Sequence, residues 1–245
     1  MTENEIFNYL EAYGLRARNA AAVLAVAPAG VKNAALSNAA ELLVRNTERI
    51  LSENQNDVEA AAAKGMSVSM QDRLRLTAAR IEAMAEGLLQ LTAMEDPIGA
   101  ILEGYKRPNG LEIIKKRVPL GVIGIIYEAR PNVPADAAGL CIKSGNACIL
   151  RGGSEALRSN LAIASIFKEA LENAGLPGAC VQLIDNTGRE IASAMMRLNR
   201  YIDVLIPRGG AGLINTVVTT ASVPVIQTGT GNCHIYADCD ADPEM

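Results

Sequence analysis

The sequence predicts an α/β protein in which an N-terminal helical region and a small β-ribbon precede a parallel nucleotide-binding sheet. Two observations lead to this class. About the first 95 residues show helical periodicity only, with apolar residues three and four positions apart. After Pro119, short apolar segments alternate with amphipathic ones, and strands that are buried on both faces of a parallel sheet have such continuous apolar sequences.

The N-terminal helical region is assigned to residues 1–97. Apolar side chains recur on one helical face and charged ones on the other. We expect helices at residues 34–50, 57–64 and 69–94. Asp96-Pro97 ends the last of these, because the residue before a proline disfavours helical geometry.

A β-ribbon is expected at residues 98–118. Apolar and polar residues alternate enough over 111–118 to predict a strand, and Asn109-Gly110 is a strong signal for a hairpin turn. The short apolar segment at 98–103 is the expected partner strand. A ribbon of this kind is typical of an appendage to a larger domain.

Residues 119–245 are assigned to the parallel nucleotide-binding region. Strands are expected at 120–127, 147–150, 181–184 and 202–206, followed by helices at 134–143, 155–173, 189–198 and 211–220. A further strand is expected to begin near His234. Ligands of such sheets bind where the strands end and the helices begin.

Four loops that follow the expected strands are rich in groups that could hold an anion or a polar ligand, and three of them contain glycine. Glycines let the backbone approach the ligand closely, and free N–H groups at helix starts favour phosphate. One such loop alone is better explained as an ordinary turn, but four at one edge favour a nucleotide site. The loops are Glu128–Asn132, Arg151–Glu155, Asp185–Arg189 and Pro207–Gly210.

Other classes of partner are disfavoured. The sequence contains neither GxxxxGK[ST] nor GxGxxG. Its two Arg-Gly-Gly triplets lie in no repetitive basic tract, and the net charge of −4 offers no general attraction to nucleic acid or anionic lipid. The apolar stretch Gly121–Tyr127 is far shorter than the roughly 20 residues of a membrane span. The acidic N-terminus is unlike a secretory signal, so we expect a cytoplasmic protein.

The five cysteines predict neither a disulfide framework nor a metal site, since no pair has CxxC spacing. Cys141, Cys148 and Cys180 are expected in the core, where free cysteine is common. Cys233 and His234 are an adjacent thiol and imidazole, but neighbours in a strand point to opposite faces. We therefore expect no catalytic role for this pair.

Several long strings resemble the γ-glutamyl phosphate reductase family, which belongs to the aldehyde dehydrogenase superfamily. Shorter matches, such as Asp72-Arg-Leu, Asp96-Pro-Ile-Gly and Arg107-Pro-Asn-Gly-Leu, extend the resemblance over nearly the whole chain. The nucleotide domain of this superfamily lacks GxGxxG. The long strings lie at residues 117–133, 136–138, 141–147, 150–156, 203–210, 223–226 and 231–234.

The resemblance implies a reaction, a cofactor and an assembly. The family reduces L-glutamyl 5-phosphate with NADPH to glutamate 5-semialdehyde and phosphate, in proline biosynthesis, through a thioester on a cysteine. That cysteine lies in a motif resembling Arg-Pro-Ser-Val-Cys-Asn, which does not occur in these 245 residues. We therefore expect a chain cut short before its catalytic domain and inactive alone. The superfamily assembles through its ribbon, so a homo-oligomer of the complete enzyme is expected.

The resemblance also implies residue roles. Asn132 corresponds to the donor to the developing oxyanion, and Arg130 joins it in binding the substrate. Arg151 and Glu155 correspond to cofactor positions, where a cation suits the 2′-phosphate of NADP(H). The expected cofactor-binding residues are Arg151, Gly152, Gly153, Ser154, Glu155, Arg208, Gly209 and Gly210.

Gln227 helps to distinguish a generic aldehyde dehydrogenase from the reductase family. Hydrolytic aldehyde dehydrogenases place a glutamate base at this position, and an amide cannot accept that proton. Gln227 and the loop Glu128–Asn132 thus argue against a generic aldehyde dehydrogenase. The remaining alternative is a catalytically inactive dinucleotide-binding or regulatory protein that lacks the nucleophile.

Overall fold

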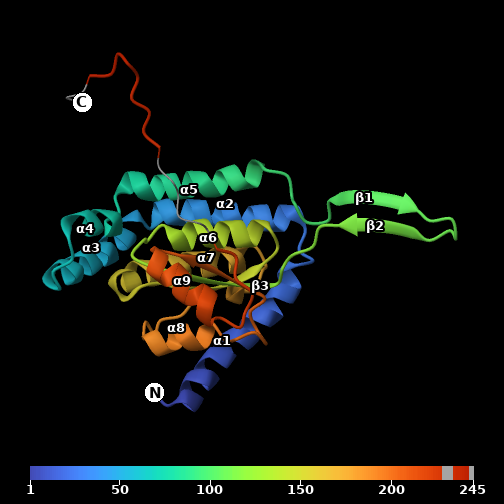
Figure 1. Cartoon of the computed structure of the whole chain (residues 1–245), viewed down its shortest axis with the longest axis horizontal. Coiled ribbons are helices and arrows are strands. Elements are labelled where there is room, and N and C mark those ends of the chain that lie inside the picture. Colours follow the sequence, from blue (N-terminus) through green and yellow to red (C-terminus); the bar gives the residue numbers. More distant parts are fainter. Residues whose placement is uncertain (228–233, 243–245) are drawn as a thin grey trace.

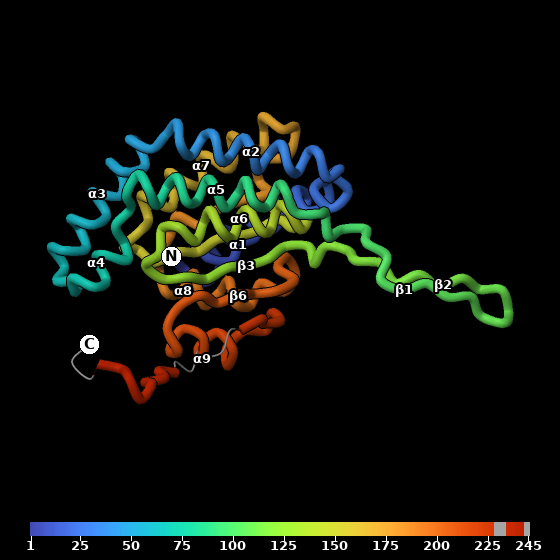
Figure 2. Tube along the Cα trace, turned by 90° about the horizontal axis from the view of Figure 1, so that it is seen from above, coloured from blue at the N-terminus to red at the C-terminus, as the bar shows by residue number. Residues whose placement is uncertain are grey.

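The structure is a layered α/β body with a two-stranded ribbon projecting from it, and its computed structural model describes residues 1–227 and 234–242 (Figure 1). A four-stranded parallel sheet lies between layers of helices (Figure 2). In the order β5-β4-β3-β6, its strands are β5 (Val181–Leu183), β4 (Ala147–Arg151), β3 (Val122–Tyr127) and β6 (Val204–Arg208). The predicted fold class is confirmed.

Helices cover both faces of the sheet. One face packs against α6 (Val133–Lys143) and α7 (Leu157–Asn173), and the other against α1 (Glu3–Leu24) and α8 (Arg189–Met195). Helix α9 (Ala211–Thr220) follows β6, and the short 3-10 helices η1 (Ser154–Ala156) and η2 (Gly178–Cys180) precede α7 and β5. The strands and crossover helices lie close to the segments that the sequence predicts.

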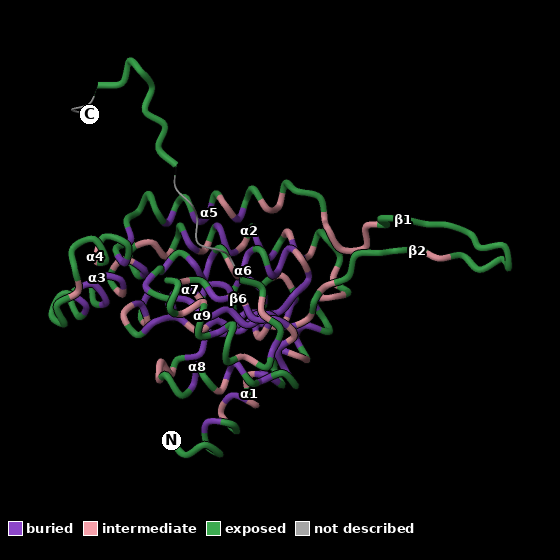
Figure 3. Tube along the Cα trace, viewed as in Figure 1, coloured by how far each residue is buried: buried purple, intermediate pink, exposed green. Residues whose placement is uncertain are grey.

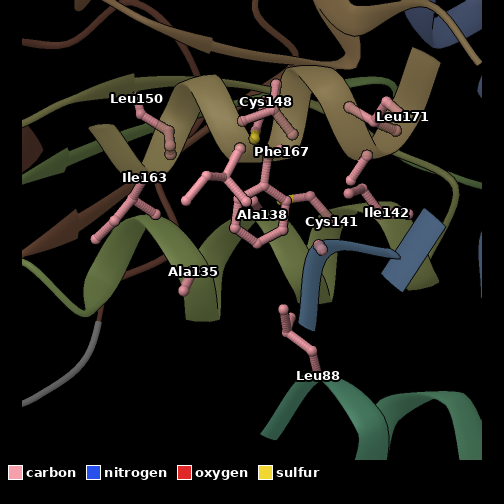
Figure 4. Packing of buried hydrophobic residues seen from close by; sticks show 14 of the residues in the cluster. Leu88, Ala135, Ala138, Cys141, Ile142, Cys148, Leu150, Ile163, Phe167 and Leu171 are labelled. Carbon is pink, nitrogen blue, oxygen red and sulfur yellow. The ribbon is translucent and has the colours of Figure 1, made fainter. Parts of the chain in front are cut away.

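Strand β3 is buried along its whole length because the core continues on both sides of it. Ile123 and Ile125 belong to the core cluster shared with α6 and α7, whereas Val122 and Ile126 belong to the cluster shared with α1 and α8. This alternation follows from the two-residue period of a strand. Figure 4 shows the first cluster, with Phe167 of α7 at its centre.

The N-terminal region is helical as expected, but its boundaries differ from the prediction. After α1 come α2 (Ala29–Arg45), α3 (Thr47–Ala63), α4 (Val68–Leu74) and α5 (Ala78–Ala93). Helix α2 packs against both α5 and α7, which places a second helical layer over the sheet (Figure 2). The helix expected at 57–64 is the last part of α3.

The single helix predicted over residues 34–50 is wrong, because the chain turns at Asn46 between α2 and α3. The Asn46 side-chain amide donates to the Leu42 carbonyl over 2.8 Å, and the Thr47 hydroxyl donates to the Val44 carbonyl over 2.8 Å. Such local side-chain bonds compete with the helical pattern. Apolar periodicity continues across the turn, so the pattern alone does not reveal it.

The single helix predicted over 69–94 is also wrong, since α4 and α5 are separated by Arg75, Leu76 and Thr77. Arg75 has an extended backbone, and the Thr77 hydroxyl accepts the Arg80 N–H over 3.2 Å as the cap of α5. A threonine in this position commonly begins a helix. The interruption places charged residues beside the sheet edge described below.

The ribbon consists of β1 (Ile101–Lys106) and β2 (Glu112–Lys116), paired antiparallel. Its turn contains Gly110 at φ +87°, a backbone conformation that favours glycine. Strand β1 begins three residues later than the segment predicted at 98–103. Every residue of β1 is exposed, and the ribbon stands clear of the body (Figure 3).

The strand predicted near His234 is not present: residues 234–238 have no regular secondary structure and are exposed. A single parallel bridge between Leu205 and Val225 adjoins β6. Among the described residues, no helix has both the length and the apolar composition needed to cross a membrane.

A buried ion pair fixes the base of the ribbon to the helical layer. The Lys32 ammonium, 2% exposed, lies 2.6 Å from the Asp96 carboxylate, which also accepts the Ile98 N–H over 2.9 Å. Burial raises the pKa of Asp96, but these bonds and the charges of Lys32 and Lys143 together lower that pKa below its usual value. The folded state therefore favours the ionised carboxylate.

We predict that Asp96→Asn lowers the free energy of unfolding by on the order of 3 kcal/mol, because it leaves the Lys32 ammonium buried without its counter-charge. The pKa of Asp96 is lower in the folded state than in the unfolded state. The stability that its carboxylate contributes is therefore fully present above the unfolded-state pKa of about 3.9 and is lost as the pH falls through the folded-state pKa. The difference in thermal midpoint from the unmodified protein should therefore shrink below about pH 4.

Glu41→Gln provides the matched control, because it breaks the exposed Glu41–Arg45 pair, whose side chains are 67% and 69% exposed. Exposed pairs contribute little, so its thermal midpoint should stay close to that of the unmodified protein. Equal effects of the two substitutions would contradict a special role for Asp96.

Candidate functional site

The carboxyl ends of the four parallel strands bring the predicted loops to one edge of the sheet. Ile126 of β3 is paired with Arg151 of β4, and Tyr127 is paired with Arg208 of β6. A cavity of about 560 Å³ opens at this edge. Its lining includes Glu128, Arg151, Gly153, Ser154, Glu155, Thr187, Arg189 and, from α9, Gly212, Leu213 and Thr216. Three of the four predicted loops thus meet at one cavity.

The expected cofactor-binding residues divide into two groups. Arg151, Gly153, Ser154 and Glu155 line the cavity directly. Gly152, Arg208, Gly209 and Gly210 belong to the same loops but lie outside the lining, and the first turns of α9 line the cavity in place of the Pro207–Gly210 loop. The assignment of all eight to a cofactor stays a prediction.

Arg151 ties two of these loops together. Its guanidinium donates to the carbonyl oxygens of Thr187 and Gly188, the latter over 3.2 Å. Burial lowers the pKa of Arg151, and the nearby carboxylates of Glu155 and Glu190 oppose this shift. The side chain therefore braces the cavity wall, in addition to any contact with a ligand.

The backbone of Gly152 lies very close to the side chains of Asn160 and Tyr127. A Cβ atom at this position would lie 2.4 Å from the Asn160 amide nitrogen and 3.0 Å from the Tyr127 ring. Both side chains are buried, and the Tyr127 hydroxyl and both polar atoms of the Asn160 amide have no hydrogen-bond partner among the described residues. Burial raises the pKa of Tyr127, so its hydroxyl stays protonated.

Glu128 links the end of β3 to the start of α9. Its carboxylate accepts the Gly210 N–H over 3.0 Å, and a Cβ atom on Gly209 would lie 2.7 Å from its carboxyl carbon. A negative charge at this position suits the positive end of the helix dipole. Glu128 thus occupies the backbone N–H of Gly210, which is one of the expected cofactor-binding residues.

Asn132, the expected oxyanion donor, begins α6 and is exposed. Its amide donates to the Asp136 carboxylate over 2.9 Å, which leaves the second N–H of the amide available. Partial desolvation raises the pKa of Asp136, while the bond from Asn132 and the charge of Arg208 oppose the shift. Asp136 therefore orients the amide that the sequence prediction assigns to catalysis.

A second cavity, of about 510 Å³, lies on the other side of the Glu128–Asn132 loop. Arg130, Pro131 and Asn132 line it together with residues of α4, α5 and the segment between them. The two residues expected to bind substrate, Arg130 and Asn132, thus share a cavity. The sequence analysis quoted Asp72-Arg-Leu as a family motif but assigned no binding role to any residue of the opposite wall.

The cysteines of the body are structural, as predicted. Cys141, Cys148 and Cys180 are buried and unpaired, and Figure 4 shows the first two in the core. A bond with Cys141 and complete burial raise the pKa of Cys148 well above its usual value, and burial raises the pKa of Cys180 to about 12. Neither Cys148 nor Cys180 is therefore a thiolate near neutral pH.

The remaining residues of interest lie near the end of the described chain. Cys239, His234 and Gln227 are exposed, and Cys233 lies outside the described residues. Within residues 1–227 and 234–242, no group of three or more His, Cys, Asp or Glu side chains is placed to hold a metal ion. The interpretation of Gln227 stays a prediction.

Some residues around the two cavities were missed by sequence reasoning. Arg189 belongs to a loop that was singled out, yet its charge was not weighed as a ligand contact. Asn160 and Tyr127 gave no signal, because their approach to Gly152 depends on the packing of α7 against β3. A Gly-Gly pair directly after a buried strand is the one available hint of such close packing.

A parallel sheet with glycine-rich loops at its carboxyl edge, lacking GxGxxG, and with a helical layer and a projecting ribbon defines the cofactor-domain class of the aldehyde dehydrogenases. Residues 10–244 match the family model described as "Aldehyde dehydrogenase family". The chain belongs to this family. The resemblance found from the motifs is thereby confirmed.

The chain is similar over nearly its whole length to proteins called gamma-glutamyl phosphate reductase. It is 56% identical to that of Heliobacterium modesticaldum, over 98% of this chain and 58% of the relative, and 59% identical to that of Clostridium botulinum, over 95% and 56%. The crystal structure of the Thermotoga maritima reductase has a TM-score of 0.90 at 43% identity, over 96% of this chain and 57% of that one. The chain thus spans a little over half the length of these relatives.

We predict that Gly152→Ala lowers the free energy of unfolding by about 1–3 kcal/mol, because its Cβ would overlap Asn160 and Tyr127 in a packed region. The matched control is Gly210→Ala, whose Cβ would have its nearest neighbour at 3.9 Å, an ordinary contact. Its unfolding free energy should stay within about 0.5 kcal/mol. Chemical denaturation of the two variants checks this, and equal stabilities would refute the packing argument.

Proposed function

We propose that the whole protein containing this chain catalyses the NADPH-dependent reduction of L-glutamyl 5-phosphate to L-glutamate 5-semialdehyde and phosphate. The single observation that carries the proposal is the position of the Glu128–Asn132 loop between two cavities, one glycine-rich and one cationic. Hydride transfer requires the nicotinamide ring and the acceptor carbon of the substrate to come together, and the proposed substrate is an anion. The similarity to reductases over nearly the whole chain supports the same reaction.

The glycine-rich cavity suits a dinucleotide, which supplies the hydride when bound. Its volume of about 560 Å³ is within the range of ligand sites, and the buried polar atoms of Tyr127 and Asn160 beside it have no hydrogen-bond partner in the described part of the chain. Arg151 and Glu155 are the proposed contacts to the adenosine ribose, and Gly153 and Ser154 those to the phosphates. Gly152, Arg208, Gly209 and Gly210 support this wall from the neighbouring loops.

The preference for NADP(H) is proposed to involve Arg189 as well as Arg151. Arg189 lines the cavity and is exposed, and its guanidinium makes no hydrogen bond or ion pair with another described residue. Arg151 already donates to two carbonyl oxygens. A free guanidinium is the better partner for a 2′-phosphate, because it can offer two parallel N–H donors.

Asn132 is the proposed donor to the oxygen that becomes negative as the acyl carbon turns tetrahedral. As a cysteine thiolate bonds to the acyl carbon, the bond from that carbon to the bridging oxygen breaks and phosphate leaves. Hydride addition to the resulting thioester then releases the aldehyde and restores the thiolate. Asp136 holds the Asn132 amide in place over 2.9 Å. A well-placed donor of this type lowers the activation free energy by roughly 3 kcal/mol. The small, soluble reactants are consistent with a cytoplasmic enzyme.

The reaction is tested with the whole protein in the reverse direction. We expect L-glutamate 5-semialdehyde, phosphate and NADP⁺ to give NADPH only when phosphate is present, because phosphate must release the acyl group. Arg189→Ala should raise the KM for NADP⁺ about tenfold and that for NAD⁺ less than twofold, since only NADP⁺ carries the 2′-phosphate.

Arg197→Ala is the matched control, since Arg197 is equally exposed and follows the same helix but does not line the cavity. Its KM values should not change. Binding of NADPH without any turnover would favour the inactive dinucleotide-binding protein instead. An unchanged NADP⁺ preference in Arg189→Ala would contradict only the role of Arg189.

Assembly of the whole protein through the ribbon is part of the proposal. Ile101, Tyr105 and Ile114 are 64%, 52% and 59% exposed, on a ribbon whose outer edges pair with no other strand within residues 1–227 and 234–242. Isolated two-stranded ribbons with exposed apolar side chains are unfavourable in water, so a second copy is the proposed partner. Tyr105→Lys with Ile114→Lys should lower the sedimentation coefficient of the whole protein. An unchanged value would contradict assembly through the ribbon.

A further inference from the structure

The cavity on the far side of the Glu128–Asn132 loop has an unusual concentration of arginines. It is bounded by the segment between α4 and α5 on one side and by the start of α6 on the other. The charged residues that line it are Arg73, Arg75, Arg80, Arg130, Asp72 and Asp136. The chain as a whole carries a net charge of −4, so this excess of positive charge is local. We call this cavity the arginine pocket.

Three of these four guanidinium groups have no hydrogen-bond or ion-pair partner among the described residues. Arg80 donates to the Asp72 carbonyl over 2.7 Å and to the Arg75 carbonyl, and it lies 3.5 Å from the Asp72 carboxylate. The side chains of Arg73, Arg75 and Arg130 make no hydrogen bond or ion pair with any other described residue, although the backbones of Arg75 and Arg130 do. One arginine thus stabilises the wall of the pocket, and three guanidinium groups remain available to an anion.

The segment that bears Arg75 is held by a buried amide. The Asn54 side chain, 2% exposed, donates to the Leu74 carbonyl over 2.8 Å and accepts the Leu76 N–H over 2.7 Å. The residues on both sides of Arg75 are therefore fixed to α3. A buried amide left without these partners would cost stability, so the interruption of the helix is a specific feature of the structure.

The arginine pocket is also adjacent to the proposed point of reaction. Asn132 lines it, and Glu128, four residues earlier, lines the nucleotide cavity. A molecule in the arginine pocket would therefore reach the amide of Asn132 from the side opposite the nucleotide. Arg73 and Arg75 come from the wall formed by α4 and the segment after it, whereas Arg130 is two residues from Asn132.

We propose that Arg73 and Arg75 bind the α-carboxylate of the acidic amino-acid substrate, at the end of the molecule opposite the reacting acyl group. This inference rests on the proposed function, because that substrate carries a carboxylate at one end and an acyl phosphate at the other. The planar guanidinium matches a carboxylate with two parallel hydrogen bonds. A phosphate has the same chemistry, so the experiment must separate the two anions.

The reverse reaction of the whole protein separates them, since the carboxylate and the phosphate then belong to different reactants. Arg75→Ala should raise the KM for L-glutamate 5-semialdehyde by about 10- to 100-fold, the effect of losing a charged hydrogen bond, with kcat changed less than threefold. The KM for phosphate should change less than twofold. Pentanal, which lacks the carboxylate, should be oxidised equally by both proteins, and Arg75→Lys should restore part of the affinity.

Arg45→Ala is the matched control, because Arg45 is an exposed helical arginine outside both cavities. Its kinetic constants should equal those of the unmodified protein. A raised KM for phosphate alone in Arg75→Ala would make the pocket a phosphate site and overturn the proposal. An equal loss with pentanal would also overturn it, because a general disturbance of the active site would then explain the effect.

A direct binding measurement keeps this inference separate from the proposed function. L-glutamate should raise the thermal midpoint of the unmodified whole protein and should fail to do so for Arg73→Ala and Arg75→Ala. If the unmodified protein shows no phosphate-dependent turnover, the proposed function fails, but this shift and its loss still support an acidic amino-acid site. Equal shifts in all three proteins would overturn the carboxylate assignment.

Discussion

The burial of β3 on both faces is the constraint on which the rest of the structure depends. Its side chains alternate between two hydrophobic clusters, and its edges pair with β4 and β6, so neither its register nor its direction can change. A shift by one residue would exchange the two faces of the strand. The ends of β3, β4 and β6 are therefore fixed together, and the loops that follow them inherit their positions.

The Glu128–Asn132 loop, which continues from β3, forms a wall shared by two cavities of different chemical character. On one side, glycines and Arg151 shape a cavity suited to a dinucleotide, and on the other, unpaired arginines shape one suited to a small anion. Glu128 anchors this wall to α9, and Asp136 anchors Asn132 to α6. The wall is thus supported by the rigid elements on both sides of it.

The sequence was informative where local pattern decides the structure. Continuous apolar segments identified every strand of the sheet, and Asn109-Gly110 identified the ribbon turn. The sequence was uninformative where side chains that are distant in the sequence determine the local structure. Asn54 fixes the break between the helices at Arg75 by bonds to residues 20 or more positions away. Arg151 donates to carbonyl oxygens 36 and 37 residues further along the chain. Arg130 and Asn132 could be chosen by resemblance, but the opposite wall of their cavity required the packing of α4 and α5.

The long-range packing of helix α1 affects how the protein folds during its synthesis on the ribosome. Its apolar face packs against α8 and the sheet, and Arg16 and Tyr13 bond to Gln182, 166 and 169 residues later. Helix α1 is therefore translated well before the surface on which it docks. During synthesis, Ile6 and Leu10 stay uncovered until that surface has emerged, and such transiently exposed apolar side chains favour aggregation.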